Sequence, residues 1–156
     1  MIRAALSLLI ILFLGCGQSL AKVAVSPVII AAEKVQAGQV FEVLCRQLGE
    51  EPVEVHFSLA LFERDHQGGV VLLEDVSSVE RVEQLLAVER RQFLLQPGQG
   101  EVVRIKVLRT DFEVLNGVLF ITPAQQGGLS TRCAVLLLLY ANGGETRLGA
   151  AWGGGP

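Results

Sequence analysis

The chain has 156 residues, which is the size of one ordinary globular domain. Apolar residues make up 51% and charged residues 19% of it, and this excludes a mainly disordered chain, because disorder requires low hydrophobicity and high charge. The net charge of -3 argues against a nucleic-acid-binding protein, which needs a basic face to hold phosphates. One Trp and one Tyr leave few aromatic surfaces on which bases or sugars could stack.

The first 21 residues have the features of a secretory signal. Arg3 precedes an almost unbroken apolar run over residues 4–14, and small residues at Ser19 and Ala21 suit cleavage after Ala21. The run is shorter than the roughly 20 residues that a spanning helix needs. We therefore expect an extracytoplasmic protein, in the periplasm, in the cell envelope or secreted, with no membrane span after cleavage. A retained membrane anchor and lipid attachment at Cys16 are the alternatives.

The rest of the chain has the pattern of an all-β domain. Apolar residues alternate with polar ones, and turn signals rich in Gly, Pro, Asp and Gln recur every 8 to 12 residues. Pro27 interrupts the first run and predicts a kinked edge strand, because proline cannot donate to a strand ladder. About seven to nine strands of an antiparallel β-sandwich are expected. The predicted strands cover residues 23–30, 40–48, 53–62, 70–73, 93–95, 101–108, 118–122 and 129–140.

One segment has a helical pattern instead. Apolar residues between Asp75 and Arg91 recur at helical spacing, and Ser77 with Glu80 resembles a capping box. We expect one short helical insertion between strands, with a charged, solvated outer face. After the sandwich, which is expected over residues 22–142, the Gly-rich stretch 143–156 is expected to form a tail. It is either a flexible end or adds a short strand at residues 146–152.

Four segments carry a resemblance to a known family. The most specific is the turn Pro97-Gly98 leading into a strand that bears Arg104. In order and spacing the segments resemble the N-terminal immunoglobulin-like domain of the periplasmic pilus chaperones (PapD-like), over roughly residues 23–142. The four segments are Val25-Ser26-Pro27, then 41–47 followed by 51–53, then 95–105, and finally 119–123 followed by a loop and the strand to Tyr140.

The resemblance implies both a fold and a mechanism. It implies an immunoglobulin-like sandwich that lends its last strand to an incomplete pilin subunit or other envelope subunit by β-strand addition. The matching strand is 133–140, with one row formed by Cys133, Val135, Leu137 and Leu139 and the other by Ala134, Leu136, Leu138 and Tyr140. We predict that Val135, Leu137 and Leu139 face the partner. An ordinary central strand, buried on both faces, is the alternative.

The sequence departs from the family at the basic pair that binds the subunit's C-terminal carboxylate. The family carries an Arg on the first strand and a Lys on the last. Here residues 23–30 contain no basic residue, and the last strand has only Arg132 at its start. A structural or scaffolding immunoglobulin-like envelope protein without a client is therefore the second hypothesis.

After cleavage of the signal, two cysteines are left, Cys45 and Cys133. Their spacing does not fit a zinc site, and no His cluster accompanies them. A disulfide between them and a pair of free thiols are the two alternatives, because the sequence does not give the Cα separation that a disulfide requires.

The residues give little support to an enzymatic function. His56 and His66 lie on a strand and in a loop, without a nucleophile and an orienting acid nearby in the chain. The acid pairs Glu50-Glu51 and Glu74-Asp75 lie in turns. We predict no enzymatic activity, no cofactor and no metal. A hydrolase or a carbohydrate-binding module that uses Tyr140 and Trp152 ranks third.

Overall fold

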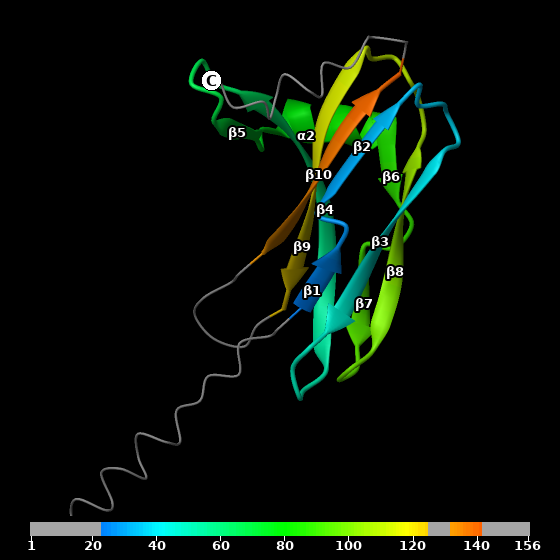
Figure 1. The fold of residues 1–156 in the computed structure, drawn as a ribbon, viewed down its shortest axis with the longest axis vertical. Helices are drawn as coiled ribbons and strands as arrows, with labels where there is room; N and C mark the ends of the chain where they lie inside the picture. The colour runs from blue at the N-terminus through cyan, green and yellow to red at the C-terminus, as the bar shows by residue number, and fades with distance from the viewer. Residues whose placement is uncertain (1–22, 125–131, 142–156) are drawn as a thin grey trace, which may run out of the picture.

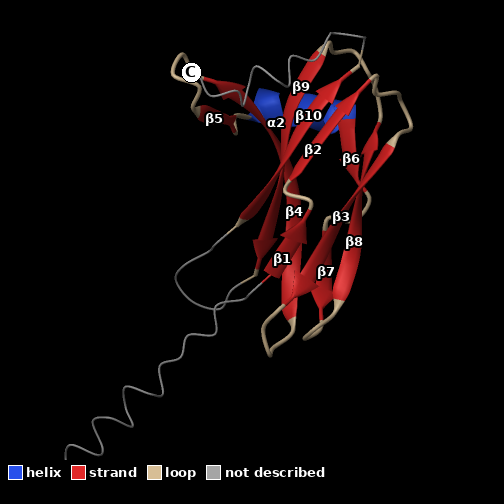
Figure 2. Cartoon of the chain, viewed as in Figure 1, coloured by secondary structure: helices blue, strands red, loops and turns tan. Residues whose placement is uncertain are grey.

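The computed structural model describes residues 23–124 and 132–141, which form two β-sheets packed face to face and one helix (Figures 1 and 2). Several predictions lie outside the described residues: the secretory signal and Cys16, the turn at 125–128, and the tail 143–156 with Trp152. Within the described ranges no helix is long and apolar enough to cross a membrane. The predicted all-β, immunoglobulin-like sandwich is confirmed.

The first sheet has four strands, all antiparallel to their neighbours. Its central strands alternate as the sequence predicted, because every second residue points into the space between the sheets. Val43, Cys45, Val103, Ile105 and Val107 form this inward row, and each is at most 2% exposed. In spatial order the strands are β1 (Val23–Ser26), β3 (Val40–Gln47), β8 (Gly100–Val107) and β6 (Leu86–Val88).

The second sheet contains the remaining strands and is antiparallel except at one edge. There β2 runs parallel to β10, the last strand. β7 (Gln92–Leu95) also pairs with this sheet, at the start of β4. The other strands, in spatial order, are β2 (Ile29–Glu33), β10 (Cys133–Tyr140), β9 (Val114–Pro123), β4 (Val53–Arg64) and β5 (Val70–Leu73).

The first predicted strand is in fact two strands in different sheets. β1 ends at Ser26 and pairs with β3, whereas β2 begins at Ile29 and pairs with β10. Pro27 stands between them, and both strands lie at the edge of their sheet, as expected for a strand next to a proline. This division, and the short strand β6, raise the number of strands in the described residues to ten.

The helical insertion is α2 (Val76–Leu85), and its cap differs from the prediction. The prediction of a cap at Ser77 was wrong, because Asp75 is the N-cap and its carboxylate accepts the Ser78 N–H at 3.1 Å. The Ser77 hydroxyl donates to the same carboxylate. The helix ends at Leu85 rather than continuing toward Arg91, because the chain becomes extended at Leu86 and pairs with β8.

Two groups of apolar side chains are buried. The main core lies between the sheets and includes Val82 and Leu85 from α2. The second group, here called the outer cluster, lies on the outer face of the second sheet, where side chains alternate with the core-facing ones. Its members are Ala60, Phe62, Val118, Phe120 and Leu138. Ala60 is therefore only 3% exposed although it lies on the outer face of the sheet.

The strand predicted at residues 118–122 begins earlier, at Val114, so that Asn116 and Gly117 lie within β9. Gly117 is the Cα partner of Leu137 on β10. A Cβ built at Gly117 would lie 3.5 Å from the Leu137 Cβ, which is ordinary contact distance. Gly117 is therefore a paired residue within the sheet.

Candidate functional site

The start of β10 has a neighbouring strand on one side only. Its full length, Cys133–Tyr140, pairs with β9, but its pairing with β2 begins at Leu136. Figure 1 shows β2 beside the upper part of β10, while the lower part extends past the start of β2. The preceding strand β1 belongs to the other sheet and does not fill this gap. In the described residues, 133–135 thus have an open edge.

The direction of the backbone groups follows from one hydrogen bond. The Leu136 N–H donates to the Val28 carbonyl at 2.9 Å, so the backbone groups of Leu136 point toward β2. Because backbone groups alternate in direction along a strand, the N–H and C=O of Ala134 point the same way, beyond the start of β2. Ala134 is also exposed. None of the described strands pairs with these groups of Ala134.

The structure places the predicted partner-facing row on the inner side of β10. Val135, Leu137 and Leu139 are each 0% exposed and belong to the main core. The face assignment in the prediction was therefore reversed, since the long apolar run gave no polar residue to mark the outside. The outward row consists of Ala134, Leu136, Leu138 and Tyr140, and Leu138 belongs to the outer cluster. Binding of a partner to β10 stays a prediction.

Arg132, the only basic residue near the last strand, is engaged within the protein. Its Nη1 lies 2.9 Å from Glu74 Oε1, and its guanidinium lies 4.2 Å from the centroid of the Phe120 ring. The side chain thus crosses the outer face of the second sheet from β10 toward the segment after β5. Sequence reasoning missed this contact, because 58 residues separate its two charged partners.

Cys45 and Cys133 are both free thiols in the structure. Cys45 is buried on β3, and burial, with a smaller effect from Cys133, raises the pKa of its thiol to about 12. Cys133 is partly buried, and its Sγ lies 3.8 Å from the Val23 carbonyl oxygen. The two residues belong to opposite sheets and pack against the same core.

The candidate catalytic residues do not come together. His56 lies on the outer face of β4, 3.9 Å from Glu54, and both side chains are 47% exposed. His66 lies in the exposed turn between β4 and β5, where Asp65 accepts the N–H groups of Gln67 and Gly69. Among the described residues no group of three or more His, Cys, Asp or Glu side chains could hold a metal ion.

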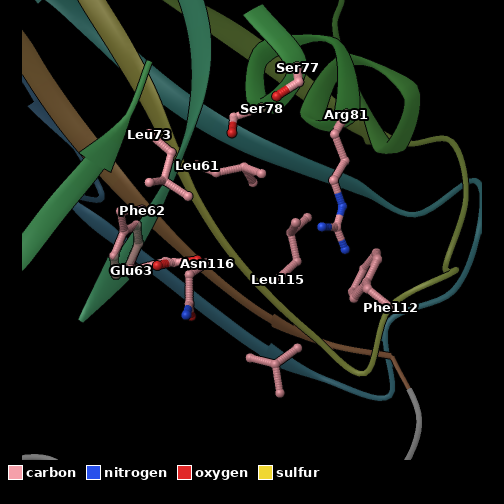
Figure 3. Close-up of a pocket in the computed structure, with 11 residues that line it drawn as sticks. Leu61, Phe62, Glu63, Leu73, Ser77, Ser78, Arg81, Phe112, Leu115 and Asn116 are labelled. Atoms are coloured by element: carbon pink, nitrogen blue, oxygen red, sulfur yellow. The ribbon is translucent and has the colours of Figure 1, made fainter. Parts of the chain in front are cut away.

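One hollow of about 540 Å³ lies beside α2. Figure 3 shows Arg81 extending from the helix toward Leu115 and Phe112. The hollow lies near the start of β9, and β9 starts opposite the end of β10, because Val114 pairs with Tyr140. It is therefore at the far end of β10 from the open edge. Its Ser77 hydroxyl is already bonded to Asp75, and nothing in it forms a catalytic set.

No family model and no curated protein sequence matches the chain. Solved structures do match. The chain is similar to the CsuC-CsuE chaperone-tip adhesion subunit pre-assembly complex from archaic chaperone-usher Csu pili of Acinetobacter baumannii, with a TM-score of 0.58 and 14% identity, over 79% of this chain and 58% of that chain. It is similar to the CupB2 chaperone of Pseudomonas aeruginosa, with a TM-score of 0.57 and 14% identity, over 82% of this chain and 60% of that one.

A third similar structure is the ASH/PapD-like domain of human CEP192, with a TM-score of 0.54 and 14% identity, over 80% of this chain and 88% of that one. The chain thus spans well under two thirds of the two bacterial chaperone chains and most of the human domain. These similarities confirm the resemblance predicted from the sequence at the level of the fold, which is that of the PapD-like domain of pilus chaperones.

Proposed function

We propose that this protein is an extracytoplasmic protein-binding module that pairs with a partner chain along the open edge of β10, in the manner of a pilus assembly chaperone. The observation that carries the proposal is the absence of a described strand beside residues 133–135, on the side where Ala134 directs its backbone groups. Pairing there would extend the second sheet by one strand, and the hydrogen bonds would be largely independent of the partner's sequence.

The fold supports the proposal, since the similar bacterial structures are chaperones and one of them is a complex with a tip adhesion subunit. The outward row of β10 supports it as well. Ala134 is small and exposed, and Leu136 next to it is partly buried. A partner strand beside them could cover the exposed part of Leu136 and add apolar contact to the backbone pairing.

The experiment compares two matched substitutions, Ala134→Pro and Ala31→Pro. Both alanines are exposed, and both direct their N–H to an open side, because Ala31 lies on the outer edge of β2. Proline at either place removes an N–H that donates to none of the described residues, so both variants should fold. The partner is identified first, in the source cells. A photo-reactive benzoylphenylalanine is placed at position 134 or at position 31, and mass spectrometry identifies the proteins that are cross-linked to it.

We expect cross-links to an exported protein from position 134, and at least a tenfold weaker affinity of the Ala134→Pro variant for that protein. The Ala31→Pro variant should bind as the original chain does. Equal affinity of both variants would contradict pairing at β10, and so would an absence of adducts from position 134. Thermal melts of the two variants confirm that each is folded.

The second candidate function is a structural or scaffolding domain without a client. The contact of Arg132 with Glu74 favours it, because a partner's carboxylate would have to compete with Glu74 for this arginine. Neither β1 nor β2 contains a Lys or Arg that could replace it. Under this hypothesis, position 134 gives no specific adduct, and neither proline variant changes any association.

A further inference from the structure

The two cysteines of the domain face the same interior space from opposite sheets. On β3, Cys45 belongs to the same inward row as the buried residues Val43 and Gln47, and it is 0% exposed. Cys133 is the first residue of β10 and belongs to the same row as Val135, which is also 0% exposed. Because side chains of one row point to one face of a sheet, both thiols are directed between the sheets.

Strand β1 connects the two cysteines in space. Val25 is the Cα partner of Cys45, and Val23, two residues earlier, has its carbonyl oxygen 3.8 Å from Cys133 Sγ. Val23 and Val25 both pack against the main core, as Cys133 does. The two thiols therefore border the same short strand, at the end of the sandwich where β10 has its open edge.

A disulfide requires the two Cα atoms to lie within about 4.4–6.8 Å, whereas facing sheets are about 10 Å apart. The Cα atoms of Cys45 and Cys133 must therefore lie closer together than this general spacing for the bond to form. The start of β10 can approach β3 because, among the described residues, a neighbouring strand holds residues 133–135 on one side only. The same segment would be harder to move in the middle of a sheet, where strands on both sides hold it.

We propose that Cys45 and Cys133 form a disulfide that joins the two sheets at the open edge of β10, when the protein meets an oxidised small-molecule disulfide or an oxidised dithiol protein. The bond sets the position of the strand end that the proposed function uses. It does not depend on that function, because the reaction can be followed without a partner.

The chemistry proceeds in two exchanges. The Cys133 thiol loses its proton, and its sulfur attacks the oxidised disulfide, which releases one thiol and leaves a mixed disulfide on Cys133. The Cys45 thiol then loses its proton and attacks Cys133 Sγ, which releases the second thiol. The two cysteines lose two electrons and two protons, and the oxidant becomes two thiols. Cys133 reacts first because it is the more exposed of the two.

The high pKa of Cys45 sets the rate of the second exchange. Burial raises it to about 12, so little thiolate is present at neutral pH. The mixed disulfide should therefore accumulate at first, and ring closure should become faster as the pH rises from 7 to 9.

The test uses the full chain with Cys16→Ser, so that Cys45 and Cys133 are the only cysteines. The protein is incubated with oxidised glutathione, denatured, treated with N-ethylmaleimide and weighed by intact mass spectrometry. We expect a monomer that has lost two hydrogen atoms and carries no maleimide or glutathione. The Tm should rise by about 5–15 °C and return on reduction.

Two control variants define the alternatives. In Cys45→Ala the glutathione adduct on Cys133 should persist, and in Cys133→Ala no adduct should form. The proposal is overturned if the original pair ends as a stable glutathione adduct, takes up two maleimides, or gives a disulfide-linked dimer. If the disulfide forms normally but the protein binds no partner, only the proposed function is contradicted.

Discussion

Arg132 and Glu74 form an ion pair of 2.9 Å across the outer face of the second sheet, and the arginine side chain covers the ring of Phe120. The pair joins the start of β10 to the segment between β5 and α2. It therefore connects the open edge to a distant part of the chain. It also engages Arg132, the basic residue that the resemblance to pilus chaperones would leave for a partner.

The strength of this pair can be measured with a double-mutant cycle of Arg132→Ala and Glu74→Ala. Both side chains are about half exposed, so we expect a coupling of only about 0.2–1 kcal/mol in the free energy of unfolding. The coupling should decrease in high salt. Arg132→Lys should recover part of it, because the ion pair is kept while the planar contact with Phe120 is lost. A coupling above about 2 kcal/mol would show a buried pair instead.

Leu136→Asp and Leu137→Asp should have opposite outcomes although the residues are neighbours. Leu137 is 0% exposed in the main core, and a carboxylate there would be desolvated without a partner, so the variant should not fold. Leu136 lies on the outward row and is partly exposed, so its variant should fold with a lower Tm. Thermal melts and soluble yield decide this. Equal collapse of both variants would mean that β10 is fully buried on both faces.

Asp75 makes the stability of α2 sensitive to acid. Hydrogen bonds from Ser77 and Ser78 lower the pKa of Asp75 from 3.8 to about 2. Because the folded pKa is depressed, this stabilisation is complete above about pH 4 and is lost as the pH falls toward 2. Asp75→Asn keeps an N-cap side chain without a titrating group. Helical circular dichroism should therefore fall less steeply between pH 4 and pH 2 in the variant, and parallel curves would exclude this role.

Gln47 is a buried polar residue whose side chain organises the turn after β3. It is 2% exposed, its Nε2 donates to the Glu51 carbonyl at 2.6 Å, and its Oε1 accepts the Gly49 N–H at 3.2 Å. Gln47→Ala should lower the free energy of unfolding by about 1–3 kcal/mol, because it leaves these backbone groups unpaired. Urea unfolding measures this. The control Gln92→Ala, at an exposed position of β7, should change it by less than about 0.5 kcal/mol.

Two glycines should respond differently to alanine. Gly98 has φ +73 with nothing within 4 Å of an added Cβ, so Gly98→Ala costs about 1–2 kcal/mol through backbone strain alone. Gly117 has no such φ, and an added Cβ would make ordinary contact with Leu137. Gly117→Ala should leave stability unchanged or raise it by up to about 1 kcal/mol. Urea unfolding of both variants tests this, and a larger loss at Gly117 would show that the strands cannot accommodate the methyl group.

Local periodicity in the sequence was enough to predict the sandwich. The alternation over residues 53–61 placed every second residue of that run in the core, namely Val53, Val55, Phe57, Leu59 and Leu61. The Pro97-Gly98 turn lies between β7 and β8 as expected. Strand faces can be predicted in this way because a polar residue at every second position marks the side that faces water. The helix was also predicted, while its cap was displaced by two residues, since Asp75 and Ser77 are both good caps and only the backbone decides between them.

The tertiary structure decided what periodicity could not. The run Val135–Leu139 is apolar at every position, so only packing shows that Val135, Leu137 and Leu139 face the core. The open edge of β10 exists because β1, which precedes Pro27, pairs with β3 in the other sheet instead of continuing beside β10. This pairing depends on strands that lie elsewhere in the chain. The Arg132–Glu74 pair, likewise, joins positions 58 residues apart. Such relationships come from the pairing of distant strands, which is not a property of any short segment of sequence.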